Sequence, residues 1–233
     1  MSSPKTLWNS QFKTFKSILL NSTKFTEAIQ LCLELHAMVH TSEMSGTSTV
    51  TFEDQLWDGL AETTFRTMPA AKDATIAWNL WHLTRIEDIT INLLVAGEPQ
   101  VFNAVNWLEK MNVTVRDTGN AMTDAEIIDL STRINMLELR KYRIAVGRKT
   151  REIIIKLQPA DLKRKMTPAN LQCIFDEGAV LPVEGSSWLV DFWGRKNVAG
   201  ILSMPVTRHQ MVHINDSLLL KAKCQSGRNK KQL

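Results

Sequence analysis

Apolar residues recur at helical spacing along most of this chain, whereas the alternating pattern of a half-buried strand is scarce. Leu31, Leu35 and Met38 form one helical stripe. A longer stripe comprises Ile127, Leu130, Ile134, Leu137 and Ile144. Apolar residues three and four positions apart are typical of helices that bury one face. The pattern therefore predicts an all-α fold.

Long helices are predicted over residues 23–41, 74–95, 124–157 and 196–223. The third begins at a capping box, Thr123 to Glu126, and ends at Pro159, while Pro205 kinks or restarts the fourth. Shorter helices are predicted over 5–20, 51–60 and 102–111 and from residue 168, and a turn followed by an aromatic segment over 182–193. The long connections between the main helices allow a four-helix bundle of crossover topology with short accessory helices.

Composition places the chain among ordinary globular proteins, with 44% apolar and 22% charged residues in 233. We expect one domain over residues 1–233. The net charge of +4 reflects five basic residues and no acid within the last thirteen positions, and without them the charge is about −1. A flexible basic tail is therefore expected at about 224–233, and specific nucleic-acid binding is not.

The cysteines and the N-terminal segment indicate where the protein resides. Cys32, Cys173 and Cys224 are far apart and form no CxxC motif, which favours free thiols in a reducing compartment. The N-terminal segment has no apolar signal core, and no stretch approaches the ~20 apolar residues of a membrane span. We therefore expect a cytoplasmic protein that does not contact a membrane.

The five histidines are the residues most suggestive of chemistry. Four lie in two similar segments, HAMVH at 36–40 and HQMVH at 209–213, and His82 lies in WHLTRIED. An HxxxH spacing on a helix places two imidazoles one turn apart on one face, so that both can reach one ion. A third ligand must then come from another helix.

His82, His209 and His213 all fall within apolar stripes of their predicted helices, so they are expected to point inward. Neutral imidazoles suit zinc or nickel, and three protein ligands leave a coordination position open. His36 and His40 lie beside the stripe that contains Leu35, so they are expected to flank the core. A lone histidine is more often a hydrogen-bonded residue than a ligand, and that reading stays open for all five.

The segments WNLWHLTRIED and MPVTRHQMVHINDSLL resemble the DinB-like (YfiT-like) superfamily of metal-binding four-helix bundles, in an order of helices that covers residues 23–223. The resemblance implies a divalent metal, zinc or nickel, on His82, His209 and His213. It also implies a metal-dependent thiol S-transferase or hydrolase, with a low-molecular-weight thiol as a small-molecule substrate. Inserts at 97–122 and 158–195 depart from a minimal bundle of this family.

Three further residues lie close to His82 in sequence and are candidates for the pocket. Trp78 precedes it by one turn and is expected to wall the site. Asn79 is a candidate for orienting a ligand from outside the metal shell. Arg85 follows by one turn and could bind a substrate carboxylate, or pair with Glu87 or Asp88.

Two classes of function remain open at this point. The first is a metal-dependent enzyme with the three-histidine site. The second is a non-catalytic helical bundle, metal-stabilised or metal-free, that acts as an interaction protein. A homodimer is compatible with either class, because the seven tryptophans can serve an interface as well as the core.

Overall fold

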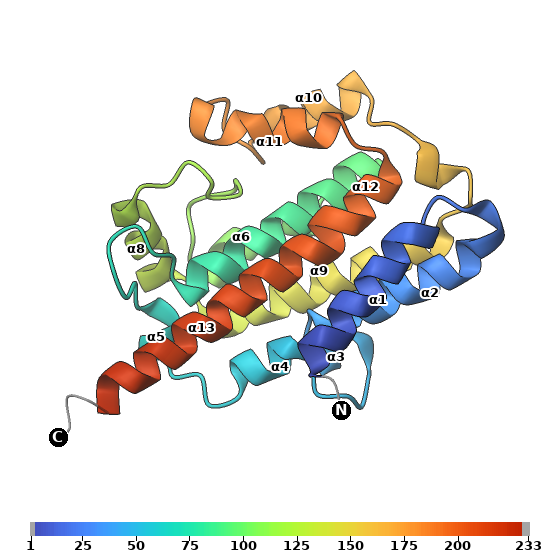
Figure 1. Ribbon diagram of the computed structural model, residues 1–233. Coiled ribbons are helices and arrows are strands. Elements are labelled where there is room, and N and C mark those ends of the chain that lie inside the picture. The colour runs from blue at the N-terminus through green and yellow to red at the C-terminus, as the bar shows by residue number, and fades with distance from the viewer. Residues whose placement is uncertain (1–2, 230–233) are drawn as a thin grey trace.

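The computed structural model describes residues 3–229, and within that range the chain is helical and has no strand (Figure 1). The α-helices are α1 (Pro4–Ile18), α2 (Phe25–Met38), α3 (Ser42–Ser45), α4 (Phe52–Trp57), α5 (Glu62–Arg66), α6 (Ile76–Asp88), α7 (Trp107–Met111), α8 (Asp124–Arg133), α9 (Met136–Lys156), α10 (Pro168–Asp176), α11 (Glu184–Gly194), α12 (Val198–Ser203) and α13 (His209–Asn229). Short 3₁₀ turns occupy Ser22–Lys24 (η1), Val101–Asn103 (η3) and Asp161–Lys163 (η4). Two π-helical segments occupy Ile89–Ala96 (η2) and Met204–Arg208 (η5).

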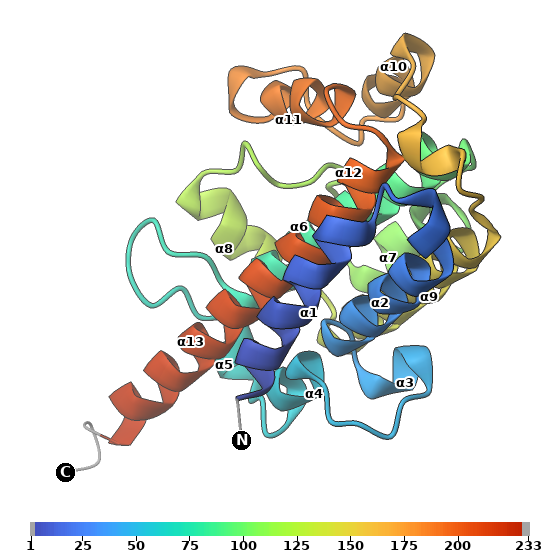
Figure 2. The same cartoon turned by 45° about the vertical axis from the view of Figure 1, so that its right-hand side comes forward.

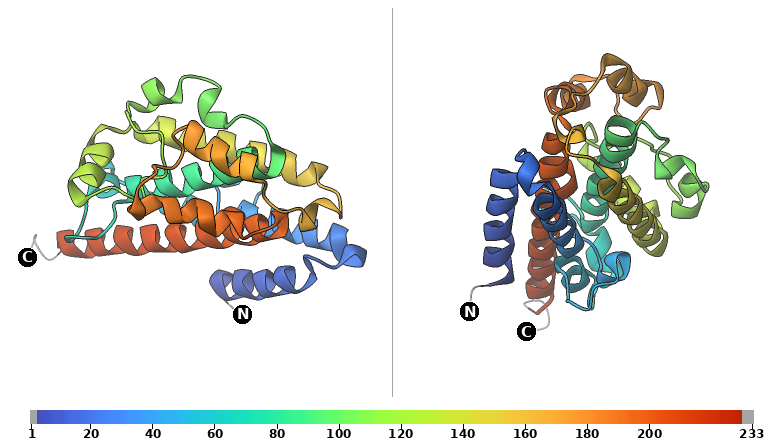
Figure 3. Two further views of the ribbon diagram at one scale, coloured as in Figure 1. Left: turned by 90° about the horizontal axis from the view of Figure 1, so that it is seen from above. Right: turned by 90° about the vertical axis from the view of Figure 1, so that its right-hand side faces the viewer.

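Four long helical units form the bundle that carries the site. They are α2, α6 with η2, α9, and α12 with η5 and α13. Helices α6 and α13 lie side by side and run in opposite directions, and α9 packs against α6 on another side (Figures 1 and 3). Helix α1 packs along α2, where the indole N–H of Trp8 donates to the Leu35 carbonyl at 3.1 Å. The all-α bundle predicted from the sequence is therefore confirmed.

The predicted single helix over 124–157 is wrong, because the chain breaks between α8 and α9. Ile134 has an extended ψ of 131°, and the Asn135 side chain accepts from the N–H groups of Leu137 and Glu138 to cap α9. The break changes the helical phase, so Leu137 is 66% exposed instead of continuing the stripe. An Asn followed by strong helix formers is the local signal for such a new start.

The predicted fourth helix is interrupted at Pro205 as expected. Proline has no N–H to donate, and the chain passes through η5 between α12 and α13. The Thr207 hydroxyl donates to the Leu202 and Ser203 carbonyls at 2.9 and 3.1 Å and so satisfies acceptors that the wider turn exposes. Helix α13 continues to Asn229, so residues 224–229 are helical, and 230–233 lie outside the described residues.

Helices α10 and α11, from the insert at 158–195, lie across one end of the bundle above α6 and α12 (Figures 1 and 2). The sequence predicted an aromatic segment at 182–193, and the structure shows an eleven-residue helix there. Trp193 of α11 is 1% exposed and joins the core, which fixes the helix against the bundle.

A buried ionic network ties four elements of the bundle together around Arg143 of α9. Its guanidinium donates to Glu53 at 2.8 Å, to the Gln210 side chain at 2.9 Å and to the Val39 carbonyl at 2.7 Å. Arg143 and Glu53 are each 1% exposed. The network therefore joins α9 to α4, to α13 and to the end of α2.

No helix in the described part of the chain is both long and apolar enough to cross a lipid bilayer. The three cysteines are free, as expected.

Candidate metal centre

His82 of α6 and His209 and His213 of α13, called the triad below, converge between the two antiparallel helices. One ring nitrogen from each lies within 4.8 Å of the other two. The Nε2 atoms of His82 and His209 are 3.2 Å apart. The ring centroids of His209 and His213 are 4.5 Å apart, which reflects their one-turn spacing on α13. The three residues that the sequence singled out are therefore brought together.

Hydrogen bonds at the outer nitrogens orient two of the three rings. His82 Nδ1 lies 2.8 Å from the Thr118 carbonyl, and His213 Nδ1 lies 3.0 Å from Asn79 Oδ1. Both oxygens can only accept, so both Nδ1 atoms carry the proton. The Nε2 atoms of these two neutral rings then present their lone pairs, which is the arrangement by which proteins prepare histidine to bind a metal.

Burial keeps the imidazoles of the triad neutral. Together with the neighbouring His213, it lowers the pKa of His82 to about 3. Burial, together with His82 and His213, holds the pKa of His209 well below its usual value. Burial also lowers the pKa of His213, although Asp216 opposes this. Neutral imidazoles are the form that binds a divalent cation.

The loop at 117–119, from the insert at 97–122, is bound to α6 by three side chains. Besides His82, Trp78 Nε1 donates to the Gly119 carbonyl at 3.2 Å and Trp81 Nε1 to the Asp117 carbonyl at 3.1 Å. Gly119 has a φ of +76°, and a Cβ there would lie 2.8 Å from Trp78 Nε1. Only glycine fits this close approach, so the loop holds the acceptor for His82 in place.

Trp78 and Asn79 both lie beside the triad. The Trp78 ring stacks on His82 with centroids 4.6 Å apart and an angle of 6° between the ring planes, and it lines a cavity next to the triad. Asn79 contacts His213 through its carbonyl oxygen, as described above. Both residues lie on the face of α6 that carries His82.

The expectation that Arg85 lies in the pocket is wrong. Arg85 is 1% exposed and its guanidinium is held elsewhere in the core. It donates to Asp88 at 3.1 Å, to the Tyr142 hydroxyl at 2.7 Å and to Gln100 at 2.6 Å. The pairing with Asp88 was the alternative that the sequence left open, but it lies inside the protein and not at the surface.

His36 and His40, called the HAMVH pair below, do not flank the core as expected, because both are fully buried. The inward face of α2 also includes Cys32 and Leu35. The two Nε2 atoms lie 2.8 and 3.0 Å from the two carboxylate oxygens of Glu87. The chain thus holds a second group of three residues whose ligand atoms are within 4.8 Å of one another.

The HAMVH pair differs from His82 and His213 in what its outer nitrogens meet, and it resembles His209, whose Nδ1 is also buried without a hydrogen-bond partner. The Nδ1 atoms of His36 and His40 are buried without a hydrogen-bond partner, and His40 Nδ1 faces Gly147 so closely that a Cβ there would lie 2.9 Å away. A buried N–H without a partner is costly, so the protons belong on Nε2, where they bond Glu87. Although burial alone would raise it, the pKa of Glu87 is held well below its usual value by His40 and His36. The pair therefore stabilises the buried carboxylate of Glu87 by hydrogen bonding.

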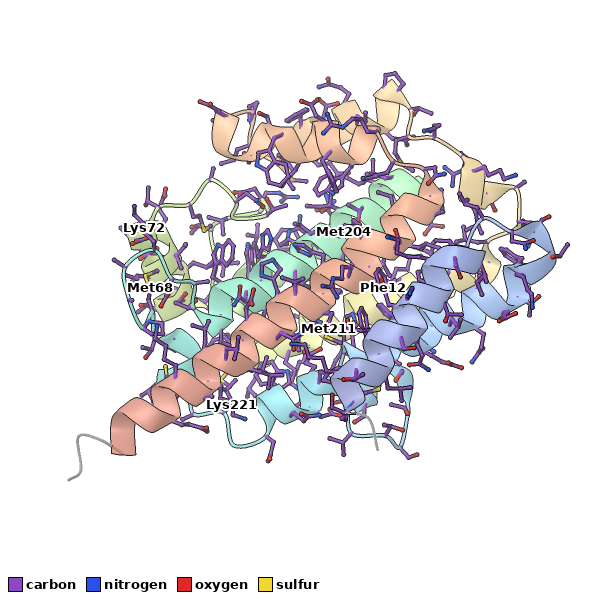
Figure 4. All side chains as sticks on the ribbon, in the orientation of Figure 1. Phe12, Met68, Lys72, Met204, Met211 and Lys221 are labelled. Atoms are coloured by element: carbon purple, nitrogen blue, oxygen red, sulfur yellow. The ribbon has the colours of Figure 1, made fainter. Side chains whose placement is uncertain are left out.

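A cavity of about 410 Å³ opens beside the triad. Its walls come from α6, from η5 and from α11, which contributes Trp188, Phe192 and Trp193. Side chains of α11 point across this space toward α6 and α12, near the labelled Met204 (Figure 4). The sequence signal for α11 was the aromatic cluster WLVDFW, and for the loop at 117–119 it was the turn-forming DTGN. Neither signal shows which part of the chain lies opposite, so both were missed as parts of the site.

A family model described as the DinB superfamily matches residues 54–215, a range that includes the triad and excludes the HAMVH pair. No curated protein matches the chain. The chain is similar to a conserved protein from Enterococcus faecalis of known crystal structure, with 16% sequence identity and a TM-score of 0.54, covering 83% of this chain and 95% of that one. At this identity the likeness shows the fold alone. Because the family match spans more than half of its residues, the chain belongs to the DinB superfamily.

Proposed function

We propose that this protein binds one divalent metal ion, zinc or nickel, through His82, His209 and His213 and uses it as an enzyme on a small molecule. The observation that carries the proposal is the orientation of the triad. Its ring nitrogens converge at the edge of a cavity, and two of its rings donate their outer N–H to oxygen acceptors. This donor set fits a borderline divalent cation.

The reaction class that we propose is thiol S-transfer or hydrolysis. A divalent metal in an open three-histidine site supplies Lewis acidity, which lowers the pKa of a thiol or a water molecule. The residues of this chain do the remaining work. Thr118 and Asn79 fix the ring orientations, Trp78 packs flat against His82, and the apolar walls exclude water around the reacting group.

Metal content measured by elemental mass spectrometry tests the site. We expect about one zinc or nickel per wild-type chain, and loss of that metal in His82→Ala, His209→Ala and His213→Ala. The matched control is His36→Gln, which changes the other buried histidine cluster and should keep the metal. Loss of metal only in the control, or no metal uptake by the wild type, would overturn the proposal. Circular dichroism of each variant separates ligand loss from unfolding.

Asn79→Ala tests the orienting role of the amide that contacts His213. We expect the affinity for the metal to fall about 10- to 100-fold, measured by competition with a chelator, because His213 loses the acceptor for its outer N–H. Asn215→Ala on α13 is the control, since its side chain donates only to the Met211 carbonyl of its own helix. Equal affinities in the two variants would contradict the role of Asn79.

Binding of a small thiol distinguishes an enzyme from the non-catalytic alternative. An open site loaded with nickel should change its absorption spectrum when 2-mercaptoethanol is added. A site that only stabilises the bundle would be coordinatively closed and give no change, and chelation would unfold the protein. That result would favour the interaction-protein function.

A further inference from the structure

We propose that the substrate group entering the cavity beside the triad is uncharged and aromatic, and that Trp188 and Phe192 of α11 select it. The inference rests on the proposed function, because it assigns the substrate class of the same site. It begins from the lining of the cavity. No Lys, Arg, Asp or Glu of the described chain lines it, and Asn120 is its polar lining residue besides the triad.

The volume and chemistry of the cavity match those of small-molecule sites. About 410 Å³ lies within the range of ordinary ligand pockets, which are apolar with a few convergent polar groups. Here the convergent polar groups are the three imidazoles. A charged substrate group placed against the remaining walls would lose its hydration without gaining a partner. The reacting atom therefore belongs at the triad and an apolar group belongs toward α11.

Two aromatic residues of α11 stand one helical turn apart on the side that faces the cavity. Trp188 is 50% exposed although it is a large apolar side chain, whereas Trp193 of the same helix is buried. The rings of Trp188 and Phe192 meet edge to face with centroids 6.4 Å apart. Packing within the protein explains why an aromatic residue stands at Trp193. The half-exposed ring of Trp188 instead has an open face that a ligand ring can cover.

The indole N–H of Trp188 already has a hydrogen-bond acceptor. Its indole N–H donates to the Gly185 carbonyl of the same helix at 3.2 Å, so the ring offers the cavity an apolar surface and no free donor. Phe192 is covered on one side by Lys196, whose amine lies 4.2 Å from the ring centroid. Together the two rings make an aromatic wall.

The opposite wall is apolar and adaptable. Met204 and Pro205 of η5 and Ile86 of α6 line it, next to Trp78. A methionine side chain adjusts to irregular ligand shapes and makes favourable contacts with aromatic rings. A flat ring held between this wall and α11 would project its substituent toward the triad.

The test uses two metal-chelating probes that differ only beyond the chelating group. Benzohydroxamate carries a phenyl ring where acetohydroxamate carries a methyl group. On the nickel-loaded protein we expect benzohydroxamate to bind about 10- to 100-fold more tightly, measured by calorimetry, because the cavity buries the ring. Equal affinities for the two probes would overturn the inference while leaving the proposed metal site standing.

Variants of α11 locate the selectivity. Trp188→Ala, and Trp188→Ala combined with Phe192→Ala, should lower the affinity for benzohydroxamate about tenfold or more and leave that for acetohydroxamate unchanged. Trp188→Phe should restore most of the preference. Leu137→Ala removes another exposed apolar side chain, remote from the cavity, and should change neither affinity. Unchanged selectivity in the Trp188→Ala variant would contradict the assignment to α11.

A second measurement does not depend on the metal. The uncharged aromatic 2-naphthol should bind the metal-free protein, and Trp188→Ala should abolish that binding in calorimetry. If the protein takes up no metal yet binds 2-naphthol, the proposed function fails and the aromatic cavity stands. If 2-naphthol does not bind the wild type, the aromatic cavity is wrong whatever the metal content.

Discussion

At the scale of single residues, the two HxxxH pairs share a spacing and differ in their surroundings. His213 of the HQMVH pair donates its outer N–H to Asn79 and presents its Nε2 lone pair, as His82 does on α6, whereas His36 and His40 donate Nε2–H to Glu87. The same five-residue pattern therefore belongs to a candidate metal site in α13 and binds a buried carboxylate at the end of α2, where His40 lies two residues beyond the helix. The spacing brings two imidazoles close together, and the surrounding residues determine which hydrogen bonds these imidazoles make.

The buried imidazole of His40 makes stability depend on pH. Burial and the charge of Arg143 together lower its pKa to about 3, although Glu87 opposes this. Below about pH 6.5 the unfolded chain takes up a proton at His40 and the folded protein does not, so stability is lost as the pH falls from 6.5 toward 3. At pH 5 the loss amounts to about 2 kcal/mol from this residue.

Urea unfolding of metal-free protein at pH 7.5 and pH 5.0 measures that loss, with His40→Gln compared with wild type. Glutamine keeps an N–H donor near Glu87 and does not titrate. Between pH 7.5 and pH 5.0 the free energy of unfolding of the variant should therefore fall by about 2 kcal/mol less than that of the wild type. Contributions from the rest of the chain are common to both proteins and cancel. An identical fall in the two proteins would show that His40 is protonated in the folded state.

The inward direction of the three triad histidines could be predicted because helical phase depends only on local spacing, and the resemblance to the DinB-like superfamily grouped His82 with the HQMVH histidines. The burial of the HAMVH pair could not, because a polar residue on the inward face of α2 is tolerated only when a partner such as Glu87 lies opposite. That partner is some fifty positions away in the chain. Arg85 was misplaced for the same reason, since Gln100 and Tyr142 reach it from other elements.

At the scale of elements, most helices followed from periodicity, and the errors lie where a helix breaks or a loop folds back. Asn135 restarts a helix inside an apolar stripe that reads as continuous. The loop at 117–119 has no periodicity, yet it supplies the acceptor for His82. Its one visible signal is Gly119, whose left-handed backbone and missing Cβ let Trp78 approach.

Gly119→Ala tests how far this loop positions the site. The positive φ costs about 1–2 kcal/mol for a residue with a Cβ, and the contact with Trp78 adds to that cost. We expect lower thermal stability together with weaker metal binding, since Thr118 moves away from His82. Gly97→Ala is the matched control, because its φ is +68° and nothing lies within 4 Å of the added Cβ. Gly97→Ala should lower the thermal stability and leave the metal affinity unchanged. Equal metal affinity in both variants would contradict a positioning role for the loop.

At the scale of the whole molecule, charged groups in the core join the helices alongside the apolar contacts. Arg143 bonds three other elements, and the Arg85–Asp88 pair with Tyr142 joins α6 to α9. Burial raises the pKa of Glu53, and the charge of Arg143 opposes that rise. The bundle therefore contains a few long-range ionic contacts that no local sequence pattern predicts.

Arg143→Met should destabilise the whole fold. It leaves Glu53 buried without its cation and the Val39 carbonyl without its donor, and breaking such a buried pair costs roughly 3–5 kcal/mol. Urea denaturation measures the free energy of unfolding. Arg148→Met on the same helix is the control, since Arg148 is exposed and donates only to the Glu43 carbonyl. A similar loss in both variants would show that the buried network adds little.

The π-helical segment η5 ends at Arg208, directly before the first histidine of HQMVH. A π turn holds one residue more than an α turn. Deleting one residue from 204–208 would remove that extra residue and restore an α turn, so α12 and α13 would keep nearly the same helical phase. All five histidines would remain in the sequence, yet the wider turn that carries Met204 and Pro205 beside the triad would be lost. An alignment gap of one position ahead of His209 would therefore signal a relative that lacks this π turn and its part of the cavity wall.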